Sequence, residues 1–461
     1  MSAEQNKNAK LEEVDVAPSS ISVFGLTENT IPKNWILGQL DTLAYINPDS
    51  ICSTTYTYSE IAYLDITNVT SGAIGKPITL PLKDAPSRAK RIVKHEDVIL
   101  STVRPGNRAY AFIKHAPNNL IVSTGFAVFR AKRGISEPRF IYYLISSNPI
   151  INYLASVAEE KTAYPSVNPD DIAECIVPIP PLEEQKAIAH ILGTLDDKIE
   201  LNRRTNETLE AMAQALFKFW FVDFGPVRAK MEGRWRRGQS LPGLPAHLFD
   251  LFPDRLVDSE LGEIPEGWRI SHIIDEFNII MGQSPPGKTY NDDGKGLPFY
   301  QGCSDFSFRF PIRRIYCTAP SRFAKKGETL VSVRAPVGDI NMASEDCAIG
   351  RGVAAACHKT GNQSYTYQFM RALNGKLLCF EAEGTVFGSI GKKDFNAITC
   401  LAPPNNLVIY YEKELSSIDK CIEINEYQSR TLTVLRDTLL PKLISGELRV
   451  KQTREEQHNG D

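Results

Sequence analysis

The most regular pattern in the chain is a seam of mostly apolar residues spaced alternately four and three positions apart, and it occurs twice. The first seam consists of Ile188, Leu192, Leu195, Ile199, Asn202, Asn206, Leu209, Ala213, Leu216 and Trp220. The second consists of Tyr411, Leu415, Ile418, Ile422, Asn425, Ser429, Leu432, Arg436, Leu439 and Leu443. This spacing is the heptad pattern of helices that pack in a coiled coil. It predicts helices at residues 181–224 and 404–450, each about 60 Å long if about 40 residues rise 1.5 Å each.

Polar residues interrupt the middle of each seam, at Asn202, Asn206, Asn425 and Ser429. A buried asparagine lowers stability but fixes the register and orientation of paired helices. An antiparallel pair would bring the polar centres together and act as a spacer with one domain at each end. The alternative is that the two helices are core helices of ordinary domains. Because Pro441 lacks a backbone N–H, we expect the second helix to end or kink near Leu440.

The regions that precede the two helices have short, β-rich apolar runs mixed with a few helical stretches. The runs lie at residues 98–103, 120–129, 329–333 and 348–356, and the helical stretches at 140–158 and 365–378. This mixture predicts an α+β domain at residues 21–180 and another at 264–403, each built on a largely antiparallel sheet. Residues 225–263 are rich in Gly and Pro and are predicted to form a surface linker. Residues 1–20 and 451–461 are polar and predicted to be flexible tails.

The sequence is duplicated internally. Residues 162–221 align without a gap to residues 385–444 at a constant offset of 223 (385 − 162), and Asp196 with Asp419 is one of many identities. Upstream, residues 31–35 match residues 264–268 at an offset of 233 (264 − 31), and the stretch between has diverged. The duplication predicts two similar units that share a framework and differ in their variable loops.

Composition is that of a globular chain with more than one domain. The 461 residues are 42% hydrophobic and 23% charged. Neither an apolar run of membrane-spanning length nor an apolar stretch near the start occurs, so we expect a cytoplasmic protein. The nine cysteines form no CxxC pair and the seven histidines show no ligand spacing. We therefore predict reduced core thiols and neither a metal site nor a cofactor site in this chain.

Positive charge is concentrated in the two globular regions. Residues 76–139 hold thirteen basic and four acidic residues, a net charge of +9, and residues 305–359 hold nine and five, a net charge of +4. The whole chain has a net charge of −3. A local basic face on a slightly acidic protein favours contact with phosphate groups. The alternative is ordinary solvated surface charge.

Two motifs resemble sites for nucleotide binding or methyl transfer, but each lacks a group that this chemistry requires. Residues 282–289 satisfy GxxxxGK[ST], but Pro285 and Pro286 lack the N–H donors that cradle phosphate, and no helix can begin behind them. Residues 284–287 resemble the methyltransferase motif [DNS]PP[YFW], but Gly287 has no ring to stack on an extruded base. A binding subunit is therefore favoured over an enzyme. The alternatives are a self-contained DNA methyltransferase or nuclease, and a protein scaffold.

Several of these segments resemble a known family. Residues 179–188 (Ile-Pro-Pro-Leu-Glu-Glu-Gln-Lys-Ala-Ile), 195–202 and 219–224 resemble the central conserved region of type I restriction-modification specificity subunits. Residues 281–286, 331–338 and 440–446 resemble the second half of the same family. The resemblance covers nearly the whole chain, from about residue 31 to residue 450.

The resemblance implies two target-recognition domains, at residues 21–180 and 264–403, that each read one half of a split, asymmetric double-stranded DNA target through the major groove. It implies that spacer helices at residues 181–224 and 404–450 form an antiparallel coiled coil that measures the gap between the halves. Two modification subunits would supply S-adenosylmethionine and methyl transfer to adenine N6. Two restriction subunits would use ATP and magnesium for translocation and cleavage. The chain itself would be non-catalytic, with no membrane association.

Candidate DNA-binding residues are those at loops bordering predicted strands and in the repeated segment before each long helix. They are Arg104, Arg108, Lys161, Thr162, Tyr164, Ser166, Arg334, Thr385, Phe387, Ser389, Lys392 and Lys393. Basic side chains at such loops suit phosphate or guanine contacts, and hydroxyls suit either kind of contact. Each arginine could instead pair with a neighbouring carboxylate.

Overall fold

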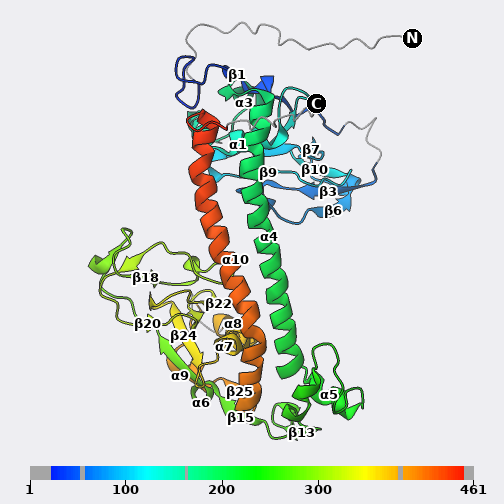
Figure 1. The fold of residues 1–461 in the computed structure, drawn as a ribbon, viewed down its shortest axis with the longest axis vertical. Helices are drawn as coiled ribbons and strands as arrows, with labels where there is room; N and C mark the ends of the chain where they lie inside the picture. Colours follow the sequence, from blue (N-terminus) through cyan, green and yellow to red (C-terminus); the bar gives the residue numbers. More distant parts are fainter. Residues whose placement is uncertain (1–21, 52–57, 161–164, 383–387, 451–461) are drawn as a thin grey trace, which may run out of the picture. The chain divides into compact units, whose positions relative to one another are not determined.

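The computed structural model describes residues 22–51, 58–160, 165–382 and 388–450. The chain divides into two compact units. The first comprises residues 1–200 with 429–461, and the second comprises residues 201–428. Both long helices contribute to both units, so each unit contains a mixed α/β domain and one stretch of each helix (Figure 1).

Among its described residues, the first unit contains two four-stranded sheets, a short hairpin of β4 (Val69–Thr70) with β5 (Ala73–Ile74), and a ladder between strands far apart in the sequence. The central sheet is antiparallel and has the order β2 (Ala44–Ile46), β11 (Phe126–Ala131), β8 (Val98–Ser101) and β9 (Tyr110–Phe112). The outer sheet has the order β6 (Ile78–Pro81), β3 (Glu60–Leu64), β10 (Leu120–Ser123) and β7 (Ala89–Ile92), and only β3 and β10 are parallel. The ladder pairs β1 (Ile36–Gln39) with β12 (Ile176–Ile179). Its short helices are α1 (Pro138–Ser146), α2 (Asn148–Glu160) and α3 (Pro169–Ala173).

The second unit repeats this plan. Its central antiparallel sheet has the order β16 (Phe277–Met281), β24 (Val353–His358), β21 (Thr329–Val333) and β22 (Val337–Met342). Its outer sheet has the order β17 (Tyr290–Asn291), β19 (Tyr316–Cys317), β18 (Leu297–Tyr300), β23 (Cys347–Ile349) and β20 (Phe323–Ala324), with β18 and β23 parallel. The ladder pairs β15 (Arg269–His272) with β25 (Thr399–Ala402). Its short helices are α6 (Ile273–Glu276), α7 (Gln363–Ala372), α8 (Asn374–Ala382) and α9 (Lys392–Ala397).

The strand registers confirm the duplication and extend it through the diverged middle. Ile36 pairs with Ile179 in the first unit, and Arg269 pairs with Ala402 in the second. These pairs stand at offsets of 233 (269 − 36) and 223 (402 − 179), the same offsets that the sequence match gives. Both central sheets have the same strand order, and both outer sheets contain one parallel pair among antiparallel ones. The predicted fold class, two α+β domains joined by long helices, is confirmed.

The two long helices are α4 (Leu182–Phe221) and α10 (Asn405–Ser445), and each begins directly after a Pro-Pro pair. In the first unit, Ile188 and Leu192 of α4 share a core with Leu443 and Ile444 of α10. In the second unit, Ala213 of α4 accepts a hydrogen bond at its carbonyl from the hydroxyl of Tyr411 in α10, at 3.2 Å. Within each unit, the contacts advance along α4 as they recede along α10. In the second unit they pass from Asn202 with Gln428 to Ala213 with Tyr411, so the paired stretches run antiparallel in each unit, as predicted.

Of the end or kink expected in the second helix near Leu440, the end is wrong, because α10 continues through Pro441 to Ser445. Proline in a helix interior costs about 3 kcal/mol, chiefly through one lost hydrogen bond and a clash. Burying a Leu or Ile side chain contributes about 1.5–3 kcal/mol each, and both Leu443 and Ile444 beyond the proline are fully buried. The helix ends instead at Gly446, whose φ of +78° suits glycine, and Leu448 N–H donates to the Lys442 carbonyl at 2.9 Å.

Residues 225–263 are not a surface linker, which corrects the prediction for that segment. They form α5 (Gly225–Met231), a 3₁₀ turn (Ala246–Leu251), β13 (Leu256–Ser259) and the start of β14 (Gly262–Pro265). Trp235 and Leu248 are fully buried in the core of the second unit, and Phe252 packs edge-on against Trp220 with ring centroids 5.3 Å apart. The segment covers the aromatic end of α4.

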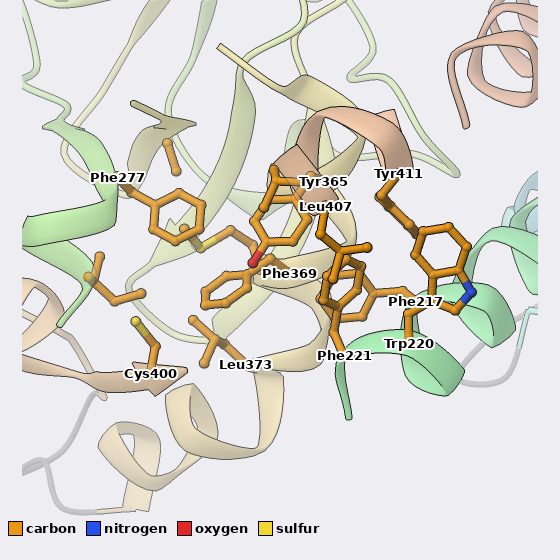
Figure 2. Packing of buried hydrophobic residues seen from close by; sticks show 14 of the residues in the cluster. Phe217, Trp220, Phe221, Phe277, Tyr365, Phe369, Leu373, Cys400, Leu407 and Tyr411 are labelled. Atoms are coloured by element: carbon orange, nitrogen blue, oxygen red, sulfur yellow. The ribbon is translucent and has the colours of Figure 1, made fainter. Parts of the chain in front are cut away.

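The core of the second unit is an aromatic cluster between α4, α7 and α10. Figure 2 shows Phe217 and Phe221 of α4 directed toward Tyr365, Phe369 and Tyr411. Centroids of contacting rings in this group lie 5.0–6.4 Å apart, within the range of favourable aromatic pairing. The cluster fixes the domain to both long helices within this unit. No helix in the described ranges has the length and apolar character needed to cross a membrane.

Candidate nucleic-acid interface

Corresponding loops at one edge of each central sheet bring several candidate residues together. In the second unit, Arg334 follows β21 and forms a bridge with Ser389. Two backbone bonds flank this bridge, from Ile390 N–H to the Val333 carbonyl at 3.0 Å and from Ala335 N–H to the Gly388 carbonyl at 3.1 Å. Arg334 and Ser389 are both exposed. Ser389, from the segment before the long helix, therefore lies beside the turn that follows β21.

The first unit makes the same contact with different side chains. Val103 forms the bridge with Ser166, Val167 N–H donates to the Thr102 carbonyl at 2.9 Å, and Arg104 N–H donates to the Pro165 carbonyl at 3.0 Å. By these bonds Arg104 corresponds to Ala335, and Val103 corresponds to Arg334. Arg104 is exposed and has a φ of +46°. The two arginines therefore leave the backbone at neighbouring positions of the repeat, and the two loops present their charge differently.

A second turn on the same edge holds an arginine that the sequence did not single out. Arg351 lies between Gly350 and Gly352, is exposed, and donates from Nε to Ser284 Oγ at 3.3 Å. A Cβ on Gly352 would lie 2.4 Å from the Gln301 carbonyl, so the turn packs too tightly for any side chain there. Gly352 accepts from Val333 N–H, as Gly125 accepts from Thr102 N–H in the first unit. The position equivalent to Arg351 is therefore Thr124, and the only sequence signal was an arginine between two glycines.

The remaining candidates are dispersed. Lys392 and Lys393 are the first two residues of α9 and are exposed, and their equivalents at the start of α3 are Pro169 and Asp170. Arg108 is half-buried and donates to Asn148 Oδ1 at 2.5 Å, so it is tied to the start of α2. Five candidates lie outside the described residues, namely Lys161, Thr162, Tyr164, Thr385 and Phe387.

Part of the basic surplus in residues 76–139 is neutralised by acidic residues outside that range. Arg139 pairs with Asp197 at 2.8 Å, and its hydrogen bonds hold the pKa of this carboxyl below its usual range. Further pairs with acidic residues outside the range join Arg88 to Asp65, Lys94 and Arg130 to Asp49, and Lys114 to Asp197. Among the described contacts, no ion pair involves the exposed residues Lys76, Lys83, Lys90, Arg104 and Arg133, or in the second unit Arg322, Lys325, Arg334, Arg351 and Lys359. These exposed donors can reach phosphate oxygens and base edges.

The polar centre of the helix seam forms one hydrogen-bonded network within the second unit. Asn206 is fully buried; its amide donates to Glu426 Oε1 at 2.9 Å, and its oxygen accepts from Asn425 Nδ2 at 2.9 Å. Asn202 is also buried and donates to Gln428 Oε1 at 2.9 Å. Of the other seam candidates, Ile422 is buried, and Leu195, Ile199, Leu209, Ile418, Asn425 and Leu432 are half-buried. The network links the two helices at one register.

The stretch that fits the phosphate-loop motif has a different backbone. Gly282 N–H donates to the Val353 carbonyl at 2.9 Å, and residues Gly287–Thr289 form a single 3₁₀ turn that leads into the strand β17. A phosphate-binding loop requires an α-helix at this point, with its N–H groups directed at the ligand. Among the residues that the structure describes, no group of three or more His, Cys, Asp and Glu side chains is arranged to hold a metal ion.

Comparison with known proteins agrees with this geometry. A family model described as the type I restriction modification DNA specificity domain matches residues 52–211. The type I restriction enzyme HindI specificity subunit of Haemophilus influenzae is 29% identical over 413 residues, covering 80% of this chain and 90% of the relative. The MjaIX specificity subunit of Methanocaldococcus jannaschii is 25% identical over 379 residues, covering 78% and 80%. A crystal structure of the type I S subunit from M. genitalium has a TM-score of 0.57 at 15% identity, covering 92% and 99%, and shares the fold. The chain is therefore similar to type I restriction-modification specificity subunits over most of its length.

Proposed function

We propose that this chain is the DNA-recognition subunit of a type I restriction-modification complex. It binds a bipartite, asymmetric target through its two domains and supports two modification and two restriction subunits. Methyl transfer from S-adenosylmethionine, and ATP- and magnesium-dependent translocation and cleavage, are carried out by those partners. The observation that carries the proposal is that one chain holds the same fold twice, with different side chains at equivalent loop positions.

The differences between the two loop edges account for an asymmetric target. The second unit presents Arg334 and Arg351, where the first presents Val103 and Thr124. An arginine can bind guanine O6 and N7 with two bonds, and a threonine offers one hydroxyl and a methyl group. Two edges with different donors favour different base sequences, so the two half-sites should not be identical.

A requirement for partners tests the proposal directly. The full chain is incubated with target DNA and S-adenosylmethionine, alone and after co-purification with its modification subunits. We expect adenine methylation only in the second case, and binding of the chain to remain dependent on salt because the loop edges contact phosphates. Methylation or cleavage of DNA by the purified chain alone would contradict the proposal and favour a self-contained enzyme.

A further inference from the structure

One loop of the second unit inserts a buried arginine between the two long helices. Arg309 is 1% exposed and belongs to the segment between β18 and β19. Its Nη1 lies 2.6 Å from Glu210 Oε2 of α4, and its Nη2 lies 2.6 Å from Asp419 Oδ1 of α10. A single side chain of the recognition domain therefore bonds both helices at once.

Other side chains contact Arg309 and its two carboxylate partners. Its guanidinium carbon lies 3.5 Å from the centroid of the Tyr367 ring. Glu210 also accepts from Gln368 Nε2 at 2.9 Å and pairs with Arg371, so two carboxylates meet two guanidinium groups. Burial raises the pKa of Asp419 despite its arginine partner, because the carboxylate loses much of its hydration. An arginine that is buried in a balanced network like this one is held in one orientation.

The next residue strengthens the attachment. Phe310 is buried in a small cluster with Met342 and Tyr367 of the domain and Ile422 of α10. Leu209 of α4 and Ile418 of α10 pack on the same cluster. Arg309 and Phe310 together place one charged and one apolar anchor of the recognition domain on the helix pair.

In the first unit, the equivalent carboxylate on α4 is bonded by different residues. Asp196 is the repeat equivalent of Asp419 (419 − 196 = 223). It accepts from the Tyr143 hydroxyl at 2.6 Å, and its arginine partner, at 2.7 Å, is Arg436 of α10 itself. The helix pair can therefore satisfy this carboxylate without an arginine from the domain. Arg309 is a feature of the second domain rather than a general requirement of paired helices.

We propose that Arg309 is a positioning residue that holds the second recognition domain in one orientation on the helix pair and so narrows the range of gaps between half-sites that the protein accepts. The inference rests on the proposed function. Base pairs follow one another at about 3.4 Å, so a small pivot of the domain brings a target with a longer or shorter gap within reach. The planar fork of arginine suits two carboxylates on two helices, whereas the point charge of lysine cannot bond both in a fixed geometry.

The test uses the full chain in complex with its modification subunits and three DNA targets. One target has the natural gap, and the others have one base pair more or less. The measured quantity is the preference, the ratio of methylation rates on the natural and the altered gaps. Loss of active protein lowers all three rates together and leaves this ratio unchanged, so general damage does not imitate the expected effect.

Three variants and one control are compared with the wild type. The triple variant Arg309→Met, Glu210→Gln, Asp419→Asn removes Arg309 and both carboxylates together, because a buried ion network can be replaced by uncharged groups without loss of the fold whereas removing one partner strands a charge. The remaining cation of the network, Arg371, is half-buried and keeps contact with solvent. Arg309→Lys keeps the charge, and Asp419→Asn keeps the pair between Arg309 and Glu210. The control is Arg313→Met, which removes an arginine of the same loop that is half-exposed and pairs with Glu345.

We expect the preference to fall by about tenfold in the triple variant, the effect of losing about 1.4 kcal/mol of discrimination. Arg309→Lys and Asp419→Asn are expected to lie between the triple variant and the wild type, and Arg313→Met to equal the wild type. Unchanged preference in the variants that fold would overturn the role of Arg309. A wild-type complex that methylates no two-part target with a fixed gap would instead overturn the proposed function, so the two failures are distinguishable.

Discussion

Replacement of Asn206 by alanine is the sharpest test of the polar centre of the helix pair. The side chain is fully buried, donates one hydrogen bond to the Glu426 carboxylate and accepts one from Asn425. A hydrogen bond to a charged group contributes about 1.5–3 kcal/mol and a neutral one about 0.5–1.5 kcal/mol. Alanine has the higher helix propensity and returns about 0.5 kcal/mol. The variant should therefore lose about 1.5–4 kcal/mol of unfolding free energy, the two hydrogen bonds less the gain in helix propensity.

The loss is measured by urea denaturation and calorimetry of the full chain. For a unit of this size, about 1.5–4 kcal/mol corresponds to a fall in the midpoint temperature of roughly 3–16 °C. Thr208→Ala is the matched control, because Thr208 is exposed on the same helix and its hydroxyl bonds only the Arg204 carbonyl. The control should stay within about 0.5 kcal/mol of the wild type. If Asn206→Ala were as stable as the control, the network would not join the helices and the reasoning would be refuted.

Three further predictions concern the loops and the first unit. Arg351→Ala should leave the midpoint temperature unchanged and weaken binding of specific DNA by about 1–3 kcal/mol if the arginine contacts a base, and an equal loss on scrambled DNA would indicate a phosphate contact instead. Gly282→Ala should destabilise the second unit by about 1–3 kcal/mol, since its Cβ would lie 2.1 Å from a backbone oxygen. The control Gly287→Ala, whose Cβ would have no neighbouring atom within 4 Å, should leave stability unchanged. Equal midpoint temperatures for the two variants would contradict the packing described. Asp197 has a lowered pKa because it accepts from Arg139, so its stabilising effect is present above its ordinary value of 3.8 and is lost as pH falls through the lowered value. The difference in urea stability between the wild type and Asp197→Asn should therefore be constant near pH 7 and shrink below pH 3.8, and a difference that grows in acid would contradict this assignment.

The long helices and the duplication could be predicted because their signals extend over many residues. A heptad pattern that extends over ten positions indicates a long helix, and the constant offset of 223 aligns the second copy with the first. The strand order of the domains could not be predicted. The offset between the two copies changes within the domains. Short buried strands such as β8 and β21 also carry no sequence feature that identifies the strands beside them.

The other differences between the sequence predictions and the structure have identifiable physical causes. The segment at residues 225–263 has many turn residues, yet widely spaced apolar side chains such as Trp235 and Leu248 bury it. The charge count of residues 76–139 did not include Asp65 and Asp197, which neutralise part of the surplus and lie 23 residues from Arg88 and 83 residues from Lys114. Arg309 resembled any other arginine of a basic region, since both of its carboxylate partners are about a hundred residues away in sequence. A local sequence pattern does not show which charged residues pair across long stretches of the chain.

The measurement that tests the account most directly is sequencing of the methylated adenines in DNA from cells that contain this chain and its modification subunits. The account predicts one target made of two different half-sites separated by a gap of constant length, with a methylated adenine in each half. A continuous target, a palindromic target, or the same methylation pattern in cells that contain the chain without those subunits would contradict it.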